Sequence, residues 1–172
     1  MAFEHRAFCF DLKVFESELG PVLYRALSDD DVKQLRDFIE RHREGMTDPY
    51  EGEPLPEEWE EMIETKDVHA YGDFALTKYY SAKDDIGIGN EWAAVSERLR
   101  GSGLDRTLLG LPFGPPANPF DPGRMGSYFQ SVEMVVENIV RLEQESPSPD
   151  IERVTNLLKV AREAGAGLYV TF

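Results

Sequence analysis

Large apolar residues alternate with other residues at both ends of this 172-residue chain. Every second position is apolar from Phe8 to Val14, and again from Leu168 to Phe172. A period of two is typical of a strand that has one face on a core. The same alternation over residues 73–81 predicts a third strand near the middle of the chain.

Five other segments have apolar residues three and four positions apart, the spacing of an amphipathic helix. They are residues 28–44, 57–63, 90–101, 127–142 and 148–164. Four of them begin with a residue that can cap the first turn: Ser28, Asn90, Ser127 and Ser148. Residues 22–27 follow Gly20-Pro21 and are too few for periodicity to decide, so we interpret them as a strand.

Strands and helices do not alternate regularly in this order, which indicates an α+β fold. We expect a single domain over residues 1–172, with a small, mainly antiparallel sheet packed by about five helices. The N- and C-terminal strands are predicted to be neighbours in that sheet. The Gly- and Pro-rich segments 45–56 and 110–126 are predicted loops, and residues 45–56 are too short a linker to separate two domains.

Composition restricts the class of protein. A net charge of −15 argues against direct binding to nucleic acid, whose phosphates would repel the chain. The single Cys9 allows no internal disulfide and suggests a reducing compartment. No segment has the length of apolar sequence that a membrane span or secretion signal requires, so we expect a cytoplasmic protein.

No motif in the sequence indicates a particular reaction or cofactor. The sequence from Gly87 to Ala93 fits the letters of a dinucleotide-binding loop. However, Lys83-Asp84-Asp85 separates it from any strand, and two aspartates would repel a pyrophosphate. We therefore expect no cofactor.

The negative charge is concentrated in residues 29–70, which hold 15 Asp and Glu against 5 Lys and Arg. Such self-repulsion costs stability, and attraction of a cationic partner would explain why it persists. Tyr50 offers an aromatic anchor inside this segment. The predicted partner-binding residues are Asp48, Tyr50, Glu51, Glu53, Glu57, Glu58, Glu60 and Glu61.

These observations predict an intracellular protein-binding domain that docks a basic protein. By analogy of class, its most concrete form is an immunity-type inhibitor that covers the positive cleft of a toxin or nuclease. Mimicry of nucleic acid by the carboxylates is a variant of the same idea. The competing interpretation is that the glutamates only solvate the surface.

The alternative function is a small-molecule-binding regulator or an enzyme that uses the loop from Gly110 to Ser127. Here Asp121, Arg124 and Ser127 precede a predicted helix, whose free amides could bind an anion.

A third group of residues has the donors that a divalent metal ion prefers: Asp67, His69 and Asp73. Their spacing matches no recurrent metal motif, and a solvated strand edge explains them equally well. No metal is therefore assigned.

Overall fold

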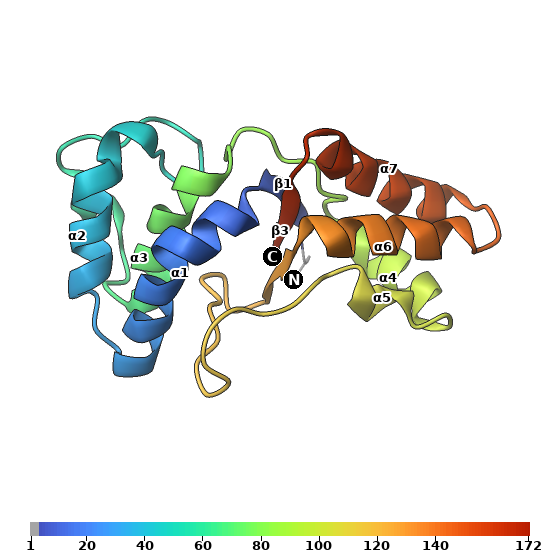
Figure 1. Cartoon of the computed structure of the whole chain (residues 1–172), viewed down its shortest axis with the longest axis horizontal. Helices are drawn as coiled ribbons and strands as arrows, with labels where there is room; N and C mark the ends of the chain where they lie inside the picture. Colours follow the sequence, from blue (N-terminus) through green and yellow to red (C-terminus); the bar gives the residue numbers. More distant parts are fainter. Residues whose placement is uncertain (1–3) are drawn as a thin grey trace. The chain divides into compact units, whose positions relative to one another are not determined.

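The two ends of the chain form neighbouring strands of one sheet (Figure 1). Strand β1 (Arg6–Phe10) pairs antiparallel with β3 (Gly167–Thr171), with Phe8 opposite Tyr169. Strand β2 (Ser127–Gln130) pairs antiparallel with the other edge of β3, so the order is β1-β3-β2. The predicted pairing of the terminal strands is confirmed, but the third strand is not the predicted one.

The computed structural model describes residues 4–172, except for the side chains of residues 106 and 107. Six helices have nine residues or more: α1 (Leu12–Asp29), α2 (Lys33–His42), α3 (Val68–Leu76), α4 (Trp92–Arg100), α6 (Val132–Glu143) and α7 (Pro149–Glu163). Shorter turns are α5 (Leu104–Thr107) and the 3₁₀ segments η1 (Arg43–Gly45), η2 (Trp59–Met62) and η3 (Thr77–Tyr79). The predicted α+β class is confirmed.

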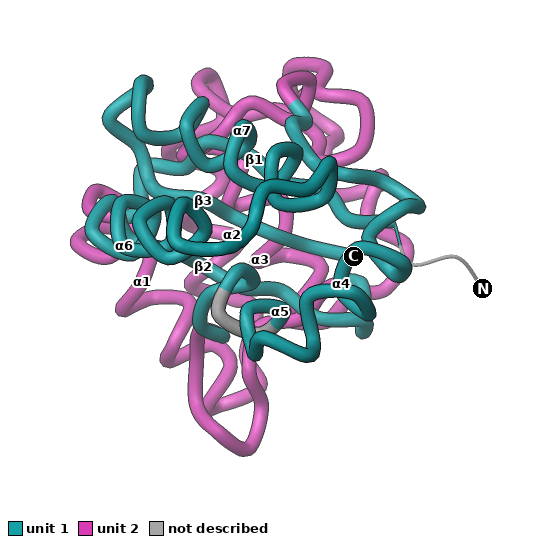
Figure 2. The backbone as a smooth tube through the Cα atoms, turned by 90° about the vertical axis from the view of Figure 1, so that its right-hand side faces the viewer, with its two compact units in different colours: residues 1–12, 85–112, 123–172 teal, residues 13–84, 113–122 magenta. Residues whose placement is uncertain are grey.

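The chain divides into two compact units (Figure 2). Unit 1 consists of Met1–Leu12, Asp85–Pro112 and Gly123–Phe172, and unit 2 of Lys13–Asp84 and Phe113–Pro122. Unit 2 contains 20 acidic residues against 9 basic ones, whereas unit 1 contains 13 against 9. Most of the net negative charge therefore belongs to unit 2. The expectation of a single domain stays a prediction.

In unit 1, apolar residues of the sheet pack with α4, α6 and α7. Ala7, Leu168 and Val170 join the buried side chains of these helices in one cluster. The alternate strand positions are aromatic: the ring of Tyr169 lies 5.0 Å from that of Phe129. Both faces of this small sheet are therefore apolar and buried.

Both outer edges of the sheet are covered by loop backbone of the same unit. Leu111 exchanges two hydrogen bonds with Phe129 on β2, of 2.9 and 2.8 Å. On β1, the amide of Ile86 donates to the carbonyl of Ala7 at 2.8 Å. Covered edges of this kind do not offer free strand partners to another chain.

In unit 2, helix α1 continues through Pro21, where the sequence predicted a break and a strand. The reason is a buried stripe at positions 15, 19, 23 and 27, which keeps the helical period on both sides of the proline. Burial of this stripe outweighs the backbone hydrogen bond that Pro21 cannot donate. The strand predicted over 22–27 is therefore wrong.

Four further boundaries differ from the sequence prediction. The first strand, predicted from Phe8 to Val14, ends at Phe10, because the residues from Leu12 onward belong to α1. The helix predicted over 28–44 begins at Lys33, because Ser28 belongs to α1 and its hydroxyl donates to the carbonyl of Tyr24. The acidic helix predicted over 57–63 is only the 3₁₀ turn η2. Residues 73–79 of the predicted strand over 73–81 lie in α3 and η3, with Phe74, Ala75 and Leu76 all buried.

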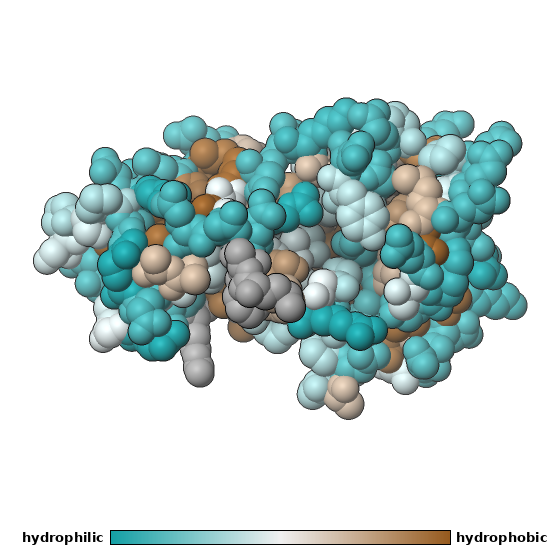
Figure 3. All heavy atoms as spheres, turned by 180° about the vertical axis from the view of Figure 1, so that it is seen from behind, coloured by the Kyte–Doolittle hydropathy of each residue, from teal (hydrophilic) through white to brown (hydrophobic). Residues whose placement is uncertain are grey.

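No helix within residues 4–172 is long and apolar enough to cross a membrane. The face drawn in Figure 3 is mainly hydrophilic, with small hydrophobic areas between polar side chains.

Candidate functional site

The predicted binding segment of unit 2 begins with a turn that is organised by Asp48. Its Oδ1 accepts the backbone N–H of Tyr50 at 2.9 Å and of Glu51 at 2.6 Å, and its Oδ2 accepts that of Glu53 at 2.9 Å. Burial raises the pKa of Asp48, but these hydrogen bonds outweigh it and hold the pKa below its usual value. Asp48 is only 3% exposed, so it shapes this surface and does not present its own charge.

Tyr50 projects from this turn and is 63% exposed. Its ring lies edge-on to that of Phe74, at a centroid distance of 6.1 Å. Partial burial, together with the charges of Asp73, Glu64 and Asp48, raises the pKa of the Tyr50 hydroxyl. An exposed aromatic ring surrounded by carboxylates is therefore held in place at one edge.

The 3₁₀ turn η2 is fixed against the same residue of α3. Trp59 is fully buried, with its ring 6.4 Å from Phe74 and 5.9 Å from Tyr71. Its indole N–H donates to Glu40 at 2.7 Å. Because Tyr50 and Trp59 both contact Phe74, the turn at Asp48 and the 3₁₀ turn lie beside each other.

Some carboxylates of the segment have partners and others are free. Lys83 donates to Glu53 at 2.9 Å, and Arg36 donates to Glu60. Within residues 4–172, the exposed side chains of Glu51, Glu57, Glu58, Glu61 and Glu64 form no ion pair. We call these five glutamates and Tyr50 the acidic surface. Glu64 was not among the predicted partner-binding residues, although it belongs to the same acidic segment.

Two of the three predicted metal donors, Asp67 and His69, are used in hydrogen bonds within unit 2. Asp67 caps α3 by accepting the N–H of Ala70 at 2.9 Å. His69 lies on the same helix: its Nε2 is 2.9 Å from Asn118 Oδ1, and its Nδ1 accepts the N–H of Asp121 at 3.1 Å. Both ring nitrogens are thus engaged. In the described part of the chain, no three His, Cys, Asp or Glu side chains are grouped to hold a metal ion.

The predicted anion site lacks the helix on which it depended. Ser127 lies in β2, with its hydroxyl 3.1 Å from that of Thr171. The helix α6 begins later, and Ser131 caps it by accepting the N–H of Met134. Asp121 belongs to unit 2, whereas the exposed Arg124 belongs to unit 1. The helix cap predicted at Ser127 is therefore wrong.

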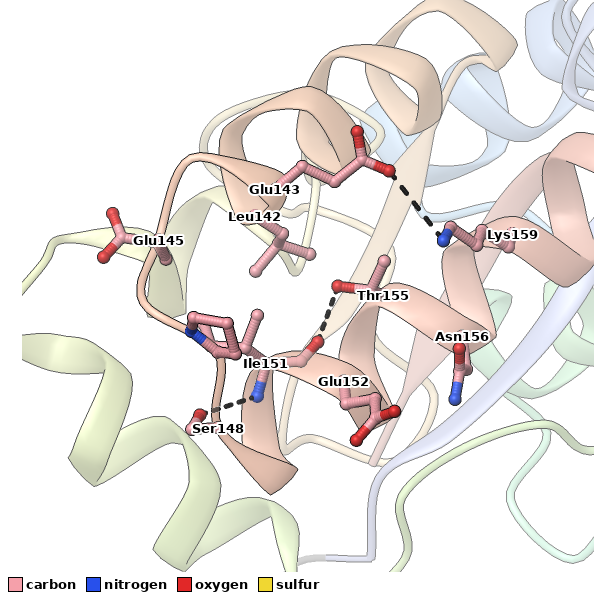
Figure 4. Close-up of a pocket in the computed structure, with 10 residues that line it drawn as sticks. Leu142, Glu143, Glu145, Ser148, Ile151, Glu152, Thr155, Asn156 and Lys159 are labelled. Carbon is pink, nitrogen blue, oxygen red and sulfur yellow. Dashed lines mark hydrogen bonds and ion pairs between the residues drawn. The ribbon is translucent and has the colours of Figure 1, made fainter.

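Unit 1 contains a cavity of about 320 Å³ where α6 is followed by α7 (Figure 4). Its lining includes Leu142 and Ile151, with Glu143 3.8 Å from Lys159 at one side. The other polar groups serve their own helix: the Ser148 hydroxyl accepts the N–H of Ile151, and Thr155 donates to the Ile151 carbonyl. The cavity therefore brings no reactive pair of side chains together.

No family model, curated protein or solved structure matches this chain.

Proposed function

We propose that unit 2 is a protein-binding module that docks a basic partner through the acidic surface. The observation that carries this proposal is the set of five exposed glutamates without ion pairs, which lie on or next to the two turns that Tyr50 and Trp59 hold against Phe74. A surface that only had to remain hydrated could distribute its charges and pair them, as Glu53 and Glu60 are paired.

The arrangement supplies both the long-range and the short-range parts of recognition. Unpaired carboxylates raise the rate at which a cationic surface approaches, and their attraction weakens as salt screens it. Tyr50 adds a large ring with a polar tip, the kind of side chain that dominates binding energy at interfaces. An Arg or Lys of the partner, lying over this ring, would gain a cation–π contact as well.

The most specific form of the proposal is an immunity-type inhibitor that covers the positive cleft of a toxin or nuclease. Rigid presentation supports this form, because Asp48 and Trp59 fix the backbone of both turns before any partner arrives. Binding then has to pay little conformational entropy for ordering these turns.

The experiment compares the wild-type protein with two triple variants as bait in extracts of the source cells. One variant carries Glu57→Lys, Glu58→Lys and Glu61→Lys on the acidic surface. The matched control carries Glu16→Lys, Glu145→Lys and Glu163→Lys, three exposed glutamates elsewhere that form no ion pair among the described residues. Both variants change the net charge by the same amount.

We expect the wild type and the control to retain the same basic protein at about 0.05 M salt and to lose most of it at about 0.5 M, where screening is strong. The acidic-surface variant should retain little of it at either salt concentration. Equal retention by both triple variants would show that only total charge matters and would refute the proposed site.

A further inference from the structure

One side of α6 in unit 1 carries a stripe of half-exposed valines. Val132, Val136 and Val140 recur every four residues and are 39%, 42% and 50% exposed. This spacing places the three side chains above one another on a single face of the helix. A different face of α6, which includes Val135 and Ile139, is buried in the core. The helix therefore has one covered and one exposed apolar face.

Valine is unfavourable at solvent-facing positions of a helix. Its β-branched side chain loses rotamer freedom in a helix, and its exposed methyl groups gain no burial in return. Helix α7 has one such residue, Val160, which is 44% exposed. A single exposed apolar residue is ordinary, but three in register indicate a contact surface.

Charged residues follow the stripe with the same spacing. Glu133, Glu137 and Arg141 each come one position after a valine, and all three are exposed. None of them forms an ion pair with any other described residue, although Glu137 and Arg141 are one turn apart. The flank is acidic towards the N-terminus of α6 and basic towards its C-terminus.

We propose that two copies of this chain associate through antiparallel α6 helices, with the valine stripes face to face and a two-fold axis beside Val136. Such an axis places Val132 of one copy against Val140 of the other. In antiparallel helices related in this way, the same flank of each helix meets its counterpart. The charged flanks then run in opposite directions along the contact.

The order of charges along this flank is complementary to the same flank of a second, antiparallel copy. At a rise of 1.5 Å per residue, the position of Arg141 in one copy is offset from that of Glu133 in the second copy by only about 3 Å along the helix axes. Two such pairs form by symmetry, whereas Glu137 faces its own counterpart and is repelled. Two attractive contacts against one repulsive contact favour the pairing.

The size of the surface limits how tightly the copies bind. A helix of 12 residues is about 18 Å long, and such a contact falls below the area of a typical stable dimer. The dimer is therefore weak and forms reversibly as concentration rises. This inference concerns unit 1 and does not depend on the function proposed for unit 2.

Sedimentation velocity of the full chain over about a hundredfold range of concentration tests this inference. We expect the weight-average mass to rise from monomer towards dimer. Val136→Glu should weaken association at least about tenfold, while the matched change Val160→Glu should alter it less than about twofold. We expect both variants to fold, because each replaces a half-exposed valine by a better helix former.

Charge variants test the antiparallel register. Arg141→Glu should weaken association, and adding Glu133→Arg should restore it, because the two reciprocal pairs are formed again with reversed signs. Glu137→Gln should strengthen it by removing the repulsion. A wild type that stays monomeric over the whole range, equal effects of Val136→Glu and Val160→Glu, or failure of the double exchange to restore association would overturn the proposal.

Discussion

His5 makes the stability of unit 1 depend on pH in a predictable direction. The side chain is 2% exposed, its ring stacks on Trp92 at 4.7 Å, and its Nδ1 accepts the N–H of Ile88 at 3.1 Å. Burial lowers the pKa of His5 to about 4, while the charge of Asp85 and a backbone hydrogen bond oppose this shift only in part. The folded protein therefore holds His5 in its neutral form.

The magnitude follows from the difference between the folded and unfolded pKa values. The ordinary value is 6.5, so the shift corresponds to about 3 kcal/mol of stability. The unfolded chain binds the proton first as pH falls. This contribution is therefore complete above pH 6.5, is lost progressively below it, and is gone below about pH 4. Between pH 7.5 and pH 5 the loss amounts to about 2 kcal/mol.

Urea unfolding of the wild type and of His5→Asn at pH 7.5, 6 and 5 measures this effect. The asparagine Oδ1 can accept the Ile88 N–H in place of Nδ1, but it does not titrate. We expect the wild type to lose about 2 kcal/mol more than the variant between pH 7.5 and pH 5. His42, whose pKa is also lowered by partial burial, is present in both proteins and cancels.

Two results would refute this reasoning. Parallel pH profiles of the wild type and His5→Asn would show that His5 does not couple to folding. A ring-proton titration of the folded protein by NMR that places the midpoint of His5 near 6.5 would show that burial does not suppress its charge.

Three further predictions concern buried or capping polar groups. Gln130 donates to the Leu108 carbonyl at 2.7 Å and accepts from Asn138 at 2.8 Å, so Gln130→Leu or Asn138→Leu alone should cost about 2 kcal/mol in urea unfolding. Replacing both residues should cost less stability than the sum of the two single changes, because neither side-chain amide then remains without its partner. Ser131→Ala should cost about 1 kcal/mol and speed amide exchange in the first turn of α6, while Ser127→Ala should leave that exchange unchanged. Asp48→Ala should cost about 2 kcal/mol in thermal or urea unfolding and weaken partner binding, whereas equal binding would show that the turn need not be preorganised.

The elements predicted correctly from the sequence are those whose cause is local. Ser148-Pro149-Asp150 contains the cap, the N1 proline and the first-turn acid of α7, and the structure has all three at that position. The C-terminal strand alternates over enough residues for the period to be recognised, whereas the N-terminal alternation continues into α1, so the end of the first strand was predicted four residues too late. Their pairing with each other is long-range, but only a few partners were available in so small a sheet.

The elements predicted wrongly depend on residues far away in the chain. Strand β2 has four residues, too few for any period, and its extended form is held by β3 some forty residues later. Helix α3 is buried almost all round, so its apolar residues show no helical stripe. Within unit 2 a Cβ on Gly72 would lie 2.8 Å from the ring of Phe120, a close approach that no local pattern reveals.

For the acidic surface, the sequence predicted the direction of the side chains better than the element that carries them. Trp59 is one of the apolar residues at helical spacing in segment 57–63, and burial of this one large ring is enough to turn Glu57, Glu58 and Glu61 outward in a 3₁₀ turn as well as in a helix. What composition could not provide is which charges remain free. The partners of Glu53 and Glu60 lie 30 and 24 residues away, so counting charges along the segment overestimated the number available to a partner. A test of the docking proposal should therefore replace the unpaired glutamates, and should keep the change in net charge equal in its control.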